Sequence, residues 1–130
     1  VVTTSLDATV LVRNLTTGQS RTLQGHRGPV TSASFSPASD AVVTASDDRT
    51  ARLWDLKTGQ PKVLAGHTGA VLSARFNPTG DRIVTASWDG TARVWDFKTD
   101  TFRVLAGHQG AVFSARFSPN GKAVVTASQD

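Results

Sequence analysis

A unit of 41 residues recurs along this chain and constrains its fold more than any other feature of the sequence. Two dipeptides mark the frame. The first is Gly-His, which occurs as Gly25-His26, Gly66-His67 and Gly107-His108. The second is Trp-Asp, which occurs as Trp54-Asp55 and Trp95-Asp96. Each dipeptide returns after 41 residues. Repetition at such a period is the signature of a protein assembled from stacked or radially arranged copies of one supersecondary unit.

Short runs rich in Val, Ile, Thr, Phe and Ala fill the space between these dipeptides, and clusters such as Asn77-Pro78-Thr79-Gly80 separate them. Such runs predict strands and such clusters predict turns, while no segment has a sustained helical period. We expect strands over residues 1–5, 9–15, 21–24, 30–35, 41–46, 50–56, 62–65, 70–76, 82–87, 91–97, 102–106, 111–117 and 123–128. The sequence therefore predicts an all-β fold with four antiparallel strands in each unit.

The complete frame runs from Gly66-His67 through Ser87-Trp88-Asp89-Gly90-Thr91 to Trp95-Asp96, with an equal match from Gly25-His26 to Trp54-Asp55. This frame resembles a blade of the WD-repeat β-propeller family, and the resemblance covers the whole chain. It implies β-propeller blades of four strands that bury their faces against one another, about three of them, in an incomplete ring. We expect one domain divided into a partial first blade (1–24), two WD repeats (25–65 and 66–106) and a partial last blade (107–130).

The resemblance also assigns the recurring polar residues to a hydrogen-bond network inside each blade. The expected sets are His26, Ser46, Asp48 and Trp54 in one blade, and His67, Ser87, Asp89 and Trp95 in the next. Thr44 and Thr85 are alternatives for the hydroxyl member. In the first unit Arg13-Asn14 stands where Trp-Asp is expected, so we expect that blade to lack the full network and to be the least rigid.

The same residues could be read as a hydrolase triad or a metal site, and we prefer the structural role. A triad needs one nucleophile in one pocket, whereas this constellation is copied at a fixed period. The three histidines would lie on different blades, without Cys or short His pairings that favour a metal. We expect no catalytic residue, no metal and no cofactor.

Function is expected at positions that change between copies while the frame persists. Three positions of the repeat vary in this way. The residue just before each tight-turn Asp is Leu6, Asp47, Trp88 or Gln129. The residue after the first Val of the strand that follows Gly-His is Thr31, Leu72 or Phe113, and the residue two positions before it is Pro29, Ala70 or Ala111. In the WD-repeat family these positions surround one end of the central channel. The resemblance thus implies a partner-binding face, on which Trp88, Leu72 and Phe113 form an exposed apolar and aromatic patch with Leu6 nearby.

Charge and composition narrow the range of partners. The net charge of +4 is modest and the basic residues are dispersed, which favours a solvated surface over a nucleic-acid site. The arginines that could contact nucleic acid are matched in pairs by the repeat, which favours a structural role for all four: Arg52, Arg75, Arg93 and Arg116. No apolar run could span a membrane and no Cys is present, so we expect a cytoplasmic protein with no membrane partner.

The two ends of the chain resemble each other, because residues 1–7 match residues 124–130. Propellers close with about four to eight blades. We expect a segment of a longer propeller; the alternative is self-association that completes the ring, with one copy of the duplicated strand displaced. Two functions remain open. The first is a non-catalytic scaffold that binds a protein or peptide. The second is a regulatory propeller segment of a larger multidomain protein, which could include an enzyme domain.

Overall fold

A computed structural model describes residues 1–130 and contains thirteen strands and no helix. The first sheet comprises β1 (Val2–Thr4), β2 (Val10–Arg13) and β3 (Ser20–Leu23). The second comprises β4 (Val30–Phe35), β5 (Ala41–Ser46), β6 (Ala51–Asp55) and β7 (Pro61–Leu64). The third comprises β8 (Val71–Phe76), β9 (Arg82–Ser87), β10 (Ala92–Asp96) and β11 (Thr101–Leu105), and the last β12 (Val112–Phe117) and β13 (Val124–Ser128). The all-β prediction is confirmed.

The second and third sheets are antiparallel meanders with the same register. Val43 pairs with Leu53 in the second sheet, and Val84 pairs with Val94 in the third. The tight turn that follows β9 reverses the chain at Gly90, whose φ of 80° is a conformation that glycine adopts without strain. The repeat in the sequence is therefore a repeat in the backbone.

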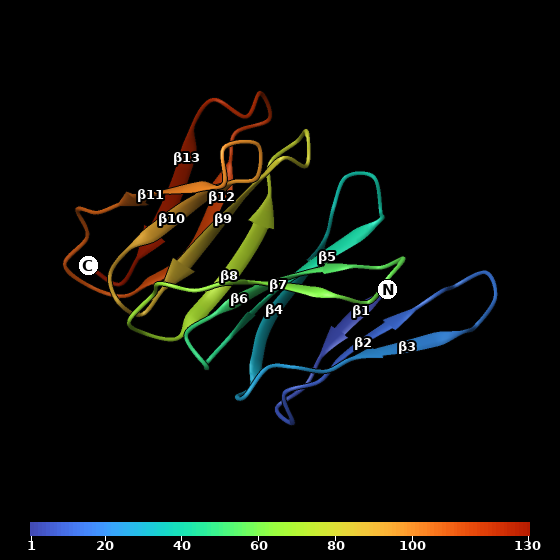
Figure 1. Cartoon of the computed structure of the whole chain (residues 1–130). Helices are drawn as coiled ribbons and strands as arrows, with labels where there is room; N and C mark the ends of the chain where they lie inside the picture. Colours follow the sequence, from blue (N-terminus) through green and yellow to red (C-terminus); the bar gives the residue numbers. More distant parts are fainter.

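The four sheets follow one another in chain order, from the first (blue) to the last (red) (Figure 1). The first strand of each meander, β4, β8 and β12, lies at a sheet edge, and β8 contacts both β4 and β12. The opposite edge strands, β7 and β11, make their main contacts within their own sheets. The sheets are thus wedges arranged in an open arc, as in an incomplete propeller, and we call β4, β8 and β12 the inner strands.

Apolar side chains fill the spaces between neighbouring sheets. Leu64 of the second sheet belongs to the same buried cluster as Ile83 and Trp95 of the third, and Leu53 packs against that cluster. Burial of apolar surface contributes about 25 cal/mol per Å². Because these clusters join different sheets, packing between sheets stabilises the arc and no sheet has a core of its own.

The first sheet departs from the others where its sequence does. Arg13 occupies the place of the buried Trp54 and Trp95; it is exposed, and its Nε donates to Ser20 Oγ at 3.2 Å. The polar residues in its first turn bond only locally, since Thr9 donates to Asp7 through both its amide and its hydroxyl. The structure contains no helix of the length and hydropathy needed to cross a bilayer.

Candidate functional site

A chain of hydrogen bonds crosses the third sheet from its third strand to its tight turn. Trp95 Nε1 donates to Thr85 Oγ1 at 3.0 Å, and Thr85 Oγ1 lies 2.8 Å from His67 Nε2. His67 Nδ1 lies 2.7 Å from Asp89 Oδ2. The second sheet repeats the arrangement with Trp54, Thr44, His26 and Asp48 at 2.9, 2.7 and 2.7 Å.

The hydroxyl member of this network is a threonine, and the expectation of Ser46 and Ser87 is wrong. Thr44 and Thr85 stand between the His and Trp rings. Ser87 Oγ instead donates to Gly69 O at 3.1 Å and accepts from the Asp89 amide, and Ser46 makes the equivalent bonds. Side chains alternate across a strand, so the serine, two residues after the threonine, shares its face but lies closer to the turn.

The rings of His26 and His67 are buried, and burial lowers the pKa of both imidazoles below 6.5 even though the neighbouring carboxylates raise it. A neutral ring fits the geometry. Nδ1–H donates to the carboxylate, while Nε2 accepts the threonine O–H and leaves that oxygen free to accept the indole N–H. Every polar group in the chain then has a partner, which makes the network stabilising.

The aspartate of each network anchors two segments at once. Asp89 Oδ2 accepts from the Thr68 amide at 3.1 Å, and Asp89 Oδ1 accepts from the Thr91 amide and hydroxyl. Burial disfavours the charge, but the bonds from Thr91, His67 and the Thr68 amide lower the pKa of Asp89 to about 2. The carboxylate therefore fastens the Gly-His loop to the tight turn.

The last sheet holds a third copy that the sequence analysis did not include. His108 Nδ1 lies 3.0 Å from Asp130 Oδ1, and His108 Nε2 lies 2.8 Å from Thr126 Oγ1. The 41-residue spacing from His67, Thr85 and Asp89 identifies all three residues. The side chain of His108 is 32% exposed, whereas that of His67 is fully buried, because two strands cover less of the ring than four.

This geometry gives the serine, histidine and aspartate side chains structural roles. Ser87 Oγ bonds to a backbone carbonyl and to a backbone amide, and His67 turns its second nitrogen to Thr85. A triad would place the serine oxygen on that nitrogen. The three histidines lie in the loops before three different strands, β4, β8 and β12, each against its own aspartate.

The positions that vary between repeats include an exposed pair of aromatic side chains. Trp88, in the turn between β9 and β10, is 57% exposed, and Phe113, on β12, is 45% exposed. Their ring centroids lie 6.2 Å apart in an edge-to-face arrangement. We call these two residues the aromatic pair; Leu72 is half-buried on the neighbouring strand β8.

The remaining variable positions divide between exposed and structural ones. Leu6, Asp47 and Gln129 are exposed in the turns equivalent to that of Trp88. Pro29, Ala70 and Ala111 accept, through their carbonyls, the amides of Asp47, Trp88 and Gln129. Ala111 is only 5% exposed and offers no side chain to a partner, which corrects the expectation for that residue. Thr31 Oγ1 donates to Val71 O at 2.6 Å and so links two inner strands.

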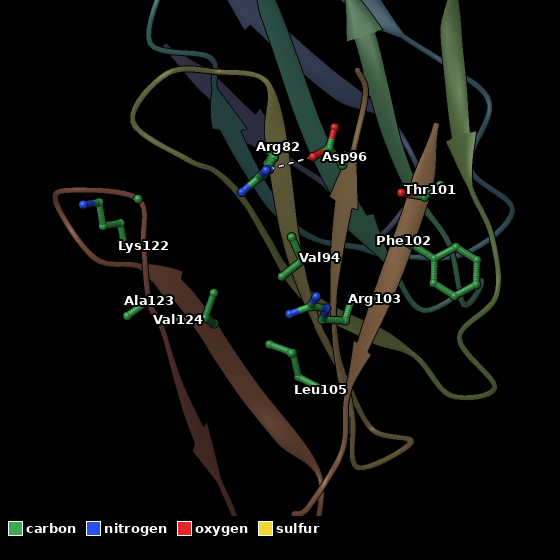
Figure 2. A pocket seen from close by; sticks show the side chains of 11 residues that line it. Arg82, Val94, Asp96, Thr101, Phe102, Arg103, Leu105, Lys122, Ala123 and Val124 are labelled. Carbon is green, nitrogen blue, oxygen red and sulfur yellow. Dashed lines mark hydrogen bonds and ion pairs between the residues drawn. The ribbon is translucent and has the colours of Figure 1, made fainter. Parts of the chain in front are cut away.

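The largest cavity, about 580 Å³, lies on the face of the third sheet that turns toward the last sheet (Figure 2). Its apolar lining includes Val94, Leu105 and Val124, which correspond in the repeat to Leu53, Leu64 and Ile83 of the packed cluster. Its polar rim includes the ion pair of Arg82 and Asp96 at 2.8 Å (Figure 2). The cavity is the part of the inter-sheet surface that the two-stranded last sheet leaves uncovered.

Comparison with known proteins assigns the repeat. A search of curated proteins gave no match. The family model described as WD domain, G-beta repeat, matches residues 18–55, 59–96 and 100–130, which together make up most of the chain. These matches span the networks of His26, His67 and His108. The chain therefore belongs to the WD40 repeat family.

Proposed function

We propose that this chain is a non-catalytic interaction scaffold whose aromatic pair, Trp88 and Phe113, binds a protein or peptide. WD40 repeats in general form protein-interaction scaffolds, and their propellers are generally non-catalytic. The observation that carries the proposal for this chain is the exposure of two large aromatic rings, side by side, at positions where the repeats differ.

The other tryptophans give the contrast that supports this role. Trp54 and Trp95 are 2% and 7% exposed, and both donate to a threonine inside the sheet. Trp88 is 57% exposed, and the equivalent positions hold Leu6, Asp47 and Gln129. The fold therefore does not require an aromatic ring there, and exposed aromatic residues are typical anchors of protein interfaces.

The test compares Trp88→Ala with the wild-type chain in quantitative affinity capture from a lysate. A suitable control is Leu15→Ala, since Leu15 is 76% exposed in the turn between β2 and β3, at the opposite strand ends from Trp88. The proposal predicts proteins that wild type and Leu15→Ala capture and that Trp88→Ala loses. Equal capture by all three chains would contradict it.

A further inference from the structure

Two neighbouring inner strands, β8 and β12, each leave an apolar side chain and an arginine accessible at equivalent positions of the repeat. On β12 the exposed residues are Phe113 and Arg116, while Val112 and Ala115 are buried. On β8 the equivalent residues Leu72 and Arg75 are half-buried, while Val71 and Ala74 are buried. Each strand has a register irregularity at its start, and the extra residue of a bulge shifts the usual two-residue alternation.

The guanidinium groups of Arg75 and Arg116 have no carboxylate partner. Arg75 Nη1 donates to Ala33 O of β4 at 3.3 Å, and no ion pair of the structure includes either arginine. Burial, together with the nearby charge of Arg116, lowers the pKa of Arg75. Two like charges on adjacent strands attract an anion, and we call Arg75 and Arg116 the arginine pair.

The repeat shows that this pair is not required by the fold. The equivalent residue on β4 is Ser34, which leaves that strand in place and paired with β5. Arg52 and Arg93 differ in this respect, since each packs close to the glycine of the Gly-His loop and over an aromatic ring of its own sheet. Arg52 and Arg93 therefore support the blade. In the arginine pair, Arg116 is exposed, and Arg75 bonds to Ala33 O through one nitrogen, which leaves its remaining N–H groups for a ligand.

We propose that the arginine pair binds an Asp or Glu side chain of the peptide that the aromatic pair anchors. This inference rests on the proposed function and specifies the chemistry of the partner. Arginine forms bidentate hydrogen bonds with a carboxylate, and these are among the strongest side-chain contacts at an interface. The net charge of +4 favours the approach of an acidic partner.

The strand geometry sets the spacing of the peptide motif. Phe113 and Arg116 are three residues apart, which corresponds to about 10 Å along a strand. An extended peptide has a similar rise per residue. The partner therefore carries an aromatic or aliphatic residue and an acidic residue about three positions apart.

The test uses extended Gly/Ser decapeptides that contain one Phe and, at separations of one to six residues, one Glu, Gln or Lys. Fluorescence anisotropy measures binding to the whole chain. The inference predicts the tightest binding for the Phe-x-x-Glu spacing, by about tenfold over the Gln peptide, as one charge-assisted pair would give. Arg116→Gln should erase this preference, while Arg103→Gln, a change of an exposed arginine on β11, should retain it.

Arg116 is exposed, so Arg116→Gln should unfold at the wild-type temperature, and Arg75→Gln is a second variant with the same predicted loss. Peptides that bind in a Trp88-dependent manner without preference for Glu would overturn this inference and leave the proposed function standing. Binding to none of the peptides, or a Glu preference that survives Arg116→Gln and Arg75→Gln, would also overturn it.

Discussion

His67 and Trp95 are joined through a single oxygen atom. The imidazole Nε2 and the indole Nε1 lie 2.8 and 3.0 Å from Thr85 Oγ1, and both hydrogen bonds are buried. The residues come from the loop before β8, from β10 and from β9. One hydroxyl therefore connects three segments of the third sheet. The faces of that sheet are stabilised separately, by packing against the neighbouring sheets.

Thr85→Val removes this oxygen and keeps the shape of the side chain. We expect a loss of about 1–3 kcal/mol in the free energy of unfolding, because buried polar groups of both rings lose their partner. Hydrogen exchange of the indole N–H of Trp95, followed by NMR, should accelerate. Ser87→Ala should leave that exchange rate unchanged, since Ser87 bonds to Gly69 and Asp89 instead; equal acceleration in both variants would contradict the assignment.

Asp89→Ala removes the acceptor that His67, Thr68 and Thr91 share. We expect a lower melting temperature, with a loss of about 1–3 kcal/mol for the orphaned groups. The control is Asp47→Ala, because Asp47 is exposed in the equivalent turn of the second sheet and its carboxylate makes no hydrogen bond or ion pair. A melting curve of Asp89→Ala that overlays the wild type would show that the network does not stabilise the blade.

Stability should decline as the pH falls below about 6.5. The pKa of His26 and of His67 is lower in the folded chain, so below 6.5 the unfolded chain takes up protons that the folded chain does not. Above that pH both rings are neutral in both states and contribute no slope. Asp48 and Asp89, whose pKa is about 2 against 3.8, add a second decline between these values. Denaturant unfolding from about pH 8 to about pH 2 measures both stages.

The histidine stage has its own control in His67→Asn. This change should remove about half of the slope between about pH 6.5 and 5, because His26 still titrates there. Most of the decline below about pH 4 should remain, because Asp48 keeps its bonds and Asp89 keeps those from Thr68 and Thr91. A free energy of unfolding that increases as the pH falls from 7 to 5 would mean that the rings are charged in the folded chain.

The strands and turns could be predicted from the sequence because each strand pattern and each turn cluster occurs in several copies of the repeat. Every predicted strand range overlaps an observed strand, and the turns fall at the Gly, Pro, Asn and Asp clusters. The choice of Ser87 over Thr85 was wrong because both hydroxyls lie on the same strand face, and only the depth of the imidazole within the sheet decides between them.

The variable positions were harder to interpret. Ala70 and Ala111 occupy the position that Pro29 has in the first complete repeat, so the side chain there changes between repeats. At all three positions the backbone carbonyl accepts a hydrogen bond from the amide in the turn, and any residue can supply that carbonyl. The sequence shows only that Arg75 and Arg116 occupy the same position in two repeats. Their lack of carboxylate partners depends on which side chains the neighbouring strands place nearby, and that is a property of the fold.

The most direct test of the division between the recurring frame and the variable face is the free energy of unfolding of Trp88→Ala beside that of Trp95→Phe. The account predicts a loss of at most about 1 kcal/mol for Trp88→Ala, the contact with Phe113 included. It predicts a loss of about 2 kcal/mol or more for Trp95→Phe, which leaves Thr85 without the indole donor. A large loss for Trp88→Ala, or an unchanged stability for Trp95→Phe, would contradict it.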